Sequence, residues 1–279
     1  MFDTHCHLNF HAFDESLEEV ISQATSSGIE YIVIPGTDIM SSQKAIKIAE
    51  KHQKIFAAVG IHPHHVLEIR NSKFETPNEE LMINNQIKTI EKLLQNTNVV
   101  AVGEVGMDRH VYEKTKYEDN SVDEDYINLQ KIFLIEQIKL AIKYKKSLIL
   151  HNREAKQDLI PIIKDYWNES LRGCSVFHCC EADEELLDFA KEHGMYIGID
   201  GDITWSKKKQ RFIKEVPLEM LVLETDSPFL TPEPIRETNP QNNPSNLRII
   251  CQKVAGIKGV NFEEIAQRTE ENGKKLFRL

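Results

Sequence analysis

Short apolar segments alternate with longer amphipathic segments along this chain, at a repeat of about 30 residues. The helix-like segments, such as SLEEVISQATSSG and YINLQKIFLIEQIKLAIKYK, carry apolar residues three and four positions apart. Eight segments have the character of strands: residues 2–7, 31–36, 56–62, 99–106, 147–151, 174–178, 195–200 and 220–226. Eight such units in 279 residues predict a TIM-type (β/α)8 barrel, completed by C-terminal helices between about residues 243 and 277.

The same pattern indicates one domain. No internal repeat, low-complexity tract or linker interrupts the alternation. Several strand-like segments are apolar at nearly every position, which is typical of parallel strands covered on both faces. With 41% hydrophobic and 28% charged residues, the chain has the composition of an ordinary globular protein. We therefore expect a single α/β domain over residues 1–279.

Charge and hydropathy exclude several kinds of protein. The formal net charge of −10 argues against a broad basic surface that coats nucleic acid, although divalent cations can hold phosphates locally. No apolar run is long enough to span a bilayer, and Met1 leads into a strand-like motif without a basic and apolar leader. The five cysteines are an odd number, which favours reduced thiols. We expect a cytoplasmic protein without membrane association.

Potential metal ligands stand where the predicted strands end. The opening motif DTHCHL places His5 and His7 two residues apart, so a regular strand directs both imidazoles to one face and Cys6 to the other. In a TIM-type barrel, residues at the carboxyl ends of the strands converge on one site. A lone histidine at a strand end is commonly structural, but here the joint pattern predicts a metal centre. The other residues at these ends are His62, Glu104, His151, His178 and Asp226.

The types of these side chains favour a particular chemistry. Imidazoles and carboxylates suit Zn, Mn, Fe or Ni, and Mg less well. A carboxylate such as Glu104 can bridge two ions, and paired ions about 3.5–4 Å apart clamp the attacking and leaving oxygens of a phosphoryl displacement. The pattern therefore predicts a hydrolase with two divalent metal ions. The expected ligands are His5, His7 and Asp226 for one ion, His151 and His178 for the other, and Glu104 between them.

Six motifs resemble, in order, the signatures of the TatD family of metal-dependent hydrolases and DNases. They are DTHCHL, VGIHPH, VGEVGMD, ILHNREA, FHCCEAD and LETDSPFL. The resemblance runs through the whole chain, and the family is similar to the wider amidohydrolase barrels. It implies dependence on Mg, Mn or Zn, hydrolysis of phosphodiesters and, in characterised members, exonuclease action on DNA.

The chain departs from the family pattern in three places. Asn9 stands where family members usually have Asp, and Asn152 where they usually have Ser. Cys179, Cys180, Glu181 and Ala182 replace the sequence CFSG. None of these positions is an expected metal ligand. The last departure puts a carboxylate beside His178 and leaves the preferred substrate open.

Three further residues are candidates near the substrate or the ligands. The resemblance places His62 near the scissile phosphate, where an imidazole N–H can donate to a nonbridging oxygen. Arg153 has the fork geometry that phosphate recognition favours, although an arginine at a helix start is also a common structural feature. Glu224 faces the same way as Asp226, so it either holds the second N–H of a ligand histidine or is a barrel-interior carboxylate bonded to the backbone.

Two charged stretches follow predicted strands. The basic stretch WSKKKQR at 205–211 is either a solvated helix face or a site where Lys207, Lys208 and Lys209 hold a polynucleotide backbone at the barrel mouth. The acidic segment at 113–126 is either a solvated loop or part of the substrate rim.

These observations predict a phosphodiesterase that cleaves the ends of single-stranded or frayed DNA through metal-bound hydroxide, with Asp226 as general base and Glu104 as the second catalytic carboxylate. Nucleic acid, DNA above RNA, is the expected substrate, and nothing in the sequence requires more than a monomer. Two alternatives stay open. One is another hydrolase on the same barrel, such as a D-aminoacyl-tRNA deacylase or a cyclic-amide hydrolase. The other is a noncatalytic binding protein.

Overall fold

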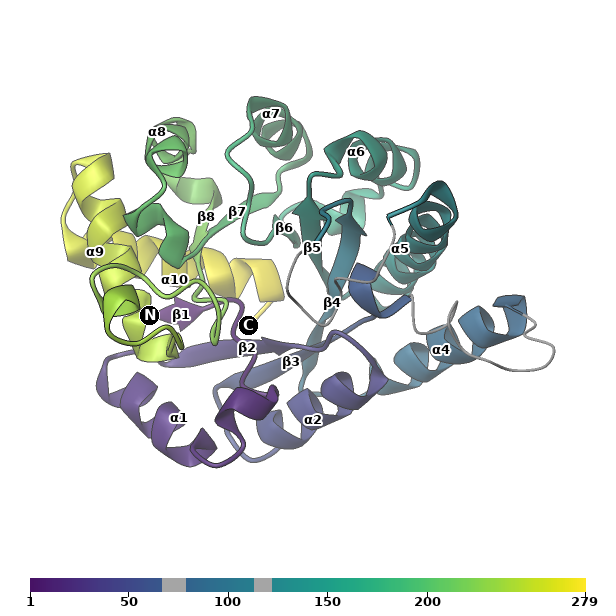
Figure 1. The fold of residues 1–279 in the computed structure, drawn as a ribbon, viewed down its shortest axis with the longest axis horizontal. Coiled ribbons are helices and arrows are strands. Elements are labelled where there is room, and N and C mark those ends of the chain that lie inside the picture. The colour runs from purple at the N-terminus through teal and green to yellow at the C-terminus, as the bar shows by residue number, and fades with distance from the viewer. Residues whose placement is uncertain (67–78, 113–121) are drawn as a thin grey trace.

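The computed structural model describes residues 1–66, 79–112 and 122–279. Most of the acidic segment at 113–126 therefore lies outside the described residues. Within them the chain forms one (β/α)8 barrel, as the sequence predicts, with helices around a ring of strands (Figure 1). The strands are β1 (Phe2–Asp3), β2 (Tyr31–Pro35), β3 (Ile55–Val59), β4 (Val99–Asp108), β5 (Ser147–Arg153), β6 (Ser175–Phe177), β7 (Tyr196–Ile199) and β8 (Leu221–Leu223).

The strands follow one another around the sheet in chain order, and each pairs in parallel with the next. Backbone hydrogen bonds also join the two ends of the sheet. The N–H of Thr4 donates to the carbonyl of Leu223 at 3.1 Å, and the N–H of Asp226 donates to the carbonyl of His5 at 2.9 Å. These two bonds place the residues that follow β1 beside those that follow β8.

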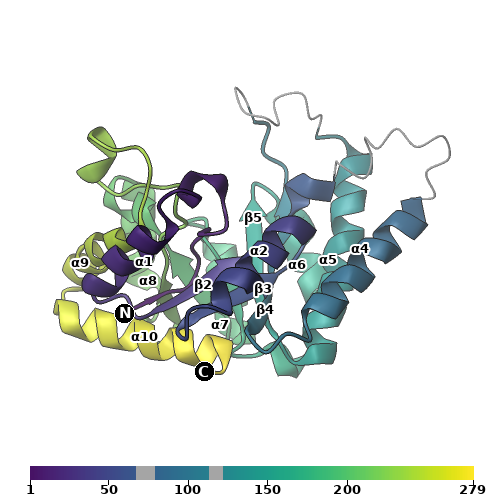
Figure 2. The ribbon, with the colours of Figure 1, turned by 90° about the horizontal axis from the view of Figure 1, so that it is seen from below.

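Helices cover the outside of the barrel (Figures 1 and 2). Aspartates begin several of them by accepting backbone N–H groups, as Asp38 does at α2 and Asp183 at α7. Among residues 1–66, 79–112 and 122–279, no helix is long and apolar enough to cross a membrane. The helices are α1 (Leu17–Ser26), α2 (Ile39–Ala49), α4 (Glu79–Leu93), α5 (Glu124–Tyr144), α6 (Lys156–Asp165), α7 (Glu184–His193), α8 (Lys207–Glu215), α9 (Leu247–Lys258) and α10 (Phe262–Phe277).

The barrel interior is a packed core. Each strand contributes one buried side chain to it, and Leu276 and Phe277 of α10 pack against the same cluster. Figure 2 shows α10 lying across one end of the barrel. This is the amino-terminal end of the strands, because Ser147 at the start of β5 bonds to the carbonyl of Leu276. The opposite end is left for a site. The strand contributions are Phe2, Val33, Ala58, Ala101, Ile149, Val176, Tyr196 and Val222.

Several strand boundaries differ from the sequence prediction. Strand β1 ends at Asp3 instead of continuing to His7, and β3 ends at Val59, three residues before His62. Strand β4 continues past the predicted end at Gly106 to Asp108. Beyond β1 and β3 the backbone bonds to loops, as His7 does to Ser227 and His62 to Thr37. The ladder between β4 and β5 instead continues to the pair of Asp108 and Arg153, and apolar content does not mark either kind of boundary.

The close packing of β4 against β5 makes Gly106 irreplaceable. A Cβ atom at this position would lie 1.9 Å from the carbonyl oxygen of His151, which is backbone and has no room to move. We expect Gly106→Ala to lower the melting temperature by more than 5 °C or to abolish soluble expression. The control is Gly256→Ala in α9, where a Cβ meets no atom within 4 Å and alanine favours the helix by about 1 kcal/mol. A Gly106→Ala protein as stable as this control would contradict the packing.

Candidate metal centre

Glu104 is a carboxylate on β4 that lies buried among histidines, with 3% of its surface exposed. One of its oxygens, Oε2, is 3.4 Å from His5 Nε2 and 3.6 Å from His7 Nε2. The two Nε2 atoms are themselves 3.1 Å apart. Asp226 adds an oxygen on the same side, with Oδ1 at 3.4 Å from His7 Nε2 and 3.7 Å from His5 Nε2. Four predicted ligands therefore meet at the junction of β1, β4 and β8.

The other oxygen of Glu104 faces a second group of histidines. Its Oε1 is 2.9 Å from His151 Nδ1, 3.2 Å from His178 Nε2 and 3.4 Å from His62 Nε2. The structure thus brings together all seven residues that the sequence singled out at strand ends. His62, which the sequence assigns to the substrate, lies as close to Glu104 as the expected ligands do.

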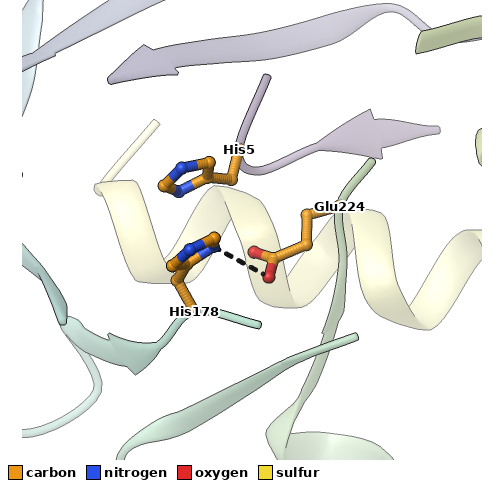
Figure 3. A group of neighbouring side chains, drawn as sticks. All are labelled: His5, His178 and Glu224. Atoms are coloured by element: carbon orange, nitrogen blue, oxygen red, sulfur yellow. Dashed lines mark hydrogen bonds and ion pairs between the residues drawn. The ribbon is translucent and has the colours of Figure 1, made fainter. Parts of the chain in front are cut away.

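Glu224 fixes the orientation of His178 through the ring nitrogen that faces away from Glu104. The Oε1 atom of Glu224 is 3.2 Å from His178 Nδ1 (Figure 3). The other ring nitrogen of His178, Nε2, lies 3.2 Å from Glu104 Oε1. The His178 ring stacks on the His5 ring, with centroids 3.6 Å apart, so the two histidine groups also support each other. The structure shows both expected roles of Glu224. Its Oε1 holds the second nitrogen of a candidate ligand and also accepts the backbone N–H of Cys179. Such contacts orient a ligand ring and raise its basicity.

Asp108 is a site residue that the sequence analysis missed. Its Oδ2 lies 3.2 Å from His151 Nε2, 2.7 Å from His64 Nε2 and 2.8 Å from the Tyr112 hydroxyl. It therefore holds His151 as Glu224 holds His178. The sequence feature that could have identified Asp108 is its position four residues after Glu104. Residues four apart on a strand share a face, and the predicted strand simply stopped too early.

The electrostatics of the centre favour positive charge. Burial acts to raise the pKa of Glu104, but the surrounding histidines, His62 and His178 first, hold that pKa well below its usual range. Burial acts to lower the pKa of His151, but hydrogen bonds to Asp108 and Glu104 raise it to about 9. The pKa of His178 is also raised well above its usual value, because Glu104 and Glu224 outweigh its burial.

These residues fit divalent cations. Imidazole nitrogens and carboxylate oxygens of three groups lie within 4.8 Å of one another: His5, His7 and Glu104, then His62, Glu104 and His151, then His5, His178 and Glu224. Unprotonated nitrogens and ionised carboxylates that converge in this way repel one another unless a cation or protons lie between them. Both groups that contain Glu104 offer the nitrogen and oxygen donors that Zn and Mn prefer.

Arg153 and the basic stretch lie at the rim. The exposed Arg153 guanidinium stacks on the Tyr112 ring, 4.9 Å from its centroid, and donates to the Tyr112 hydroxyl at 3.1 Å. The prediction for Lys209 is wrong. This side chain is buried and its Nζ lies 3.0 Å from Asp200 Oδ2 and 2.8 Å from Asp202 Oδ2, because two carboxylates on the turn after β7 compensate its charge.

Two of the departures from the family pattern contact each other. The Asn152 amide donates to Glu181 Oε2 at 2.6 Å, and the backbone N–H of Glu154 donates to Glu181 Oε1 at 3.0 Å. Glu181 therefore braces the end of β5 on both sides of Arg153. The carboxylate of Glu181, which replaces a small residue near His178, therefore bonds within the protein and fixes the segment that carries Arg153.

A (β/α)8 barrel whose histidines and carboxylates converge at the carboxyl ends of the strands defines a class, the metal-dependent hydrolases. Comparison with known proteins gives the family. The protein-family model described as TatD related DNase matches residues 2–278. The chain therefore belongs to the TatD family of metal-dependent hydrolases.

Relatives match over the full length of the chain. It is 34% identical over 281 residues to the uncharacterized metal-dependent hydrolase YabD of Bacillus subtilis (strain 168), covering 100% of this chain and 99% of that protein. It is 29% identical over 289 residues to a protein of Pantoea ananatis named 3'-5' ssDNA/RNA exonuclease TatD, covering 100% of each. The crystal structure of YJJV, a TatD homologue from Escherichia coli K12, matches with a TM-score of 0.83 and 27% identity over 100% of this chain and 98% of that one.

The raised pKa values of His151 and His178 predict that cation binding releases protons. At pH 7 a ring with a pKa of about 9 is protonated, and a cation that takes its nitrogen must displace that proton. The affinity for Mn²⁺ should therefore rise from pH 6 to pH 8. Calorimetric titration in two buffers of different ionisation enthalpy measures both the affinity and the protons released.

The matched control is His193→Gln. His193 is buried in α7 and bonds to the carbonyl of Phe189, outside the centre, so this variant should release as many protons as the wild type. An affinity that does not change with pH, with no proton release, would contradict the assignment of these histidines as ligands.

Proposed function

We propose that this protein is a divalent-metal-dependent phosphodiesterase that removes nucleotides from the ends of single-stranded DNA. One observation carries the proposal. The two oxygens of Glu104 face two separate groups of histidines, and this is the arrangement that a carboxylate between two cations requires. Two cations so placed suit a displacement at phosphorus. The relative named as a single-strand exonuclease, which matches the whole chain, supports nucleic acid as the substrate.

The residues that would hold the cations are those that converge on Glu104. When bound, two divalent cations polarise a phosphoryl oxygen and lower the pKa of water. His5, His7 and Asp226 would hold one ion, and His151 and His178 the other, with Glu104 shared between them.

Asp226 would accept a proton from the attacking water. Its backbone N–H is fixed by the carbonyl of His5, and its side chain is 13% exposed while Glu104 and His5 are nearly inaccessible. It is therefore the carboxylate of the centre that water can reach.

His62 and Arg153 would bind the phosphate. The His62 ring is buried, and burial holds its pKa well below the usual value. Its Nδ1 accepts the backbone N–H of His64, so the neutral ring carries its one N–H at Nε2, beside Glu104, and this group would donate to a nonbridging oxygen. The Arg153 guanidinium, held by Tyr112 and by the brace at Glu181, offers two N–H groups in one plane for an adjacent phosphate.

Removal of metal should abolish hydrolysis. Protein stripped with a chelator and resupplied with Mg²⁺, Mn²⁺ or Zn²⁺ is assayed on single strands labelled at the 5′ or the 3′ end, with D-aminoacyl-tRNA and a cyclic amide as further substrates. We expect metal-dependent release of nucleotides. Release of an amino acid without nucleotides would support the alternative hydrolase, and full activity of the stripped protein would exclude metal chemistry.

Asp226→Asn tests the base. Asn keeps the shape and one oxygen but cannot take a proton, so the variant should fold, bind at least one metal ion and lose about 100-fold or more in kcat, the range of a general base. Asp202→Asn is the control. Asp202 lies on the turn after β7 and pairs with Lys209 of α8, without touching Glu104. Near-native turnover of Asp226→Asn at saturating metal would remove the base from the mechanism.

His62→Ala and Arg153→Ala should separate substrate binding from metal binding. Each variant should keep its full metal content and lose activity, because the groups removed contact phosphate. Metal content is measured by mass spectrometry and activity by steady-state kinetics. Loss of one metal equivalent in His62→Ala would instead make His62 a ligand, as its 3.4 Å approach to Glu104 also permits.

A further inference from the structure

Three aromatic rings form a cluster on the His7 side of the centre. The Phe10 ring lies against the His7 ring with centroids 4.3 Å apart and an interplanar angle of 21°. Phe229 meets Phe10 nearly edge-on, with centroids 6.0 Å apart and an angle of 77°, and its centroid is 6.3 Å from that of His7. Phe229 therefore contacts both a candidate metal ligand and the ring stacked on it.

The backbone fixes Phe229 relative to the centre. Its N–H donates to the carbonyl of Asp226 at 2.9 Å, and the N–H of His7 donates to the carbonyl of Ser227 at 2.8 Å. Phe229 thus belongs to the same hydrogen-bonded turn as the proposed base. Any group that rests on its ring is held at a defined place beside Asp226.

Phe229 is 50% exposed, although a phenyl ring loses free energy in water. Single exposed apolar side chains are common on protein surfaces and need no function. Phe229 differs from such residues because its ring packs edge-on against His7 and Phe10, and because its backbone is bonded to the turn that carries Asp226. An exposed ring beside Asp226 suits a planar ligand group that stacks on it.

The positively charged guanidinium of Arg153 lies on the opposite side of the barrel mouth from Phe229. In the sheet order, β4 and β5 lie across the barrel from β1 and β8, so Arg153 and Phe229 stand on opposite sides of the barrel mouth. A single strand of nucleic acid presents this combination of groups, since its bases have flat faces and its phosphates carry charge. Aromatic side chains bind single strands by stacking on bases of any sequence.

We propose that Phe229, supported edge-on by Phe10, is a base-stacking platform for the nucleotide at the scissile bond. The proposal rests on the proposed function and adds how the end of the single strand is held: by its unpaired terminal base, without preference for base identity. The stacked base would lie toward β1 and β8, and the neighbouring phosphate toward Arg153. A terminal base held in a duplex has its faces covered by its neighbours and would have to fray first.

The test is a fluorescence titration with a single-stranded oligonucleotide that carries 2-aminopurine at its end and a phosphorothioate at its terminal linkage to slow hydrolysis. Stacking on an aromatic ring quenches 2-aminopurine. Wild-type protein with Mg²⁺ should quench a terminal probe, at the 5′ or the 3′ end, more than a probe in mid-strand. Phe229→Leu, which keeps apolar bulk without a ring face, should lose this quenching, and Phe229→Trp should restore it.

Kinetics on an abasic end supply the second measurement. Phe229→Leu should raise KM on ordinary single strands about tenfold, within the range found for one stacked base. On a strand whose terminal nucleotide has no base, wild type and Phe229→Leu should have the same KM, because the interaction is already absent. Leu279→Ala, an exposed apolar residue after α10 at the closed end of the barrel, is the control and should match wild type on both substrates.

The outcomes separate this proposal from the function on which it rests. Nucleotide release by wild type with terminal quenching unchanged in Phe229→Leu would overturn the platform and leave the nuclease standing. Absence of quenching in wild type would also overturn it. Failure of the wild-type protein to release nucleotides from any single strand would overturn the nuclease, and the platform with it.

Discussion

A buried carboxylate surrounded by imidazoles is the interaction on which the site depends. Glu104 is almost fully removed from water, and an uncompensated charge in such a place is strongly destabilising. The nitrogens of five histidines within 3.6 Å of its two oxygens supply the compensation. Protons or cations can provide the positive charge at those nitrogens. Folding and metal binding are therefore coupled at one residue on β4.

The barrel supplies the frame that this arrangement needs. Histidines far apart in the chain meet at Glu104 because parallel strands end at the same rim, and hydrogen bonds across the β8–β1 junction bring Asp226 beside His5. Outer carboxylates then fix the rings. Glu224 holds His178, and Asp108 holds His151 together with Tyr112, which in turn contacts the rim arginine. Arg153 at the rim is thus connected to Glu104 through contacts of Tyr112, Asp108 and His151.

The alternation of apolar and amphipathic segments was enough to predict the barrel. The position of ligand-type residues at strand ends was enough to predict seven of the side chains that meet at the centre, but not Asp108, which contacts His151. Contacts between loops could not be predicted in this way. The three-lysine stretch has the composition of a solvated or phosphate-binding face, but Lys209 is buried because Asp200 and Asp202 on the preceding turn surround it. The contact of Glu181 with Asn152 joins two loops, and no spacing in the sequence encodes it. Such pairs depend on where the rim places each loop.

The central claim is that Glu104 lies between two cations, and anomalous diffraction tests it most directly. Crystals of the protein grown with Mn²⁺ would be measured on both sides of the manganese absorption edge. The account predicts two anomalous peaks, one next to Glu104 Oε2 among His5, His7 and Asp226, and one next to Oε1 among His151 and His178. A single peak at saturating Mn²⁺, or two peaks on the same side of Glu104, would contradict it.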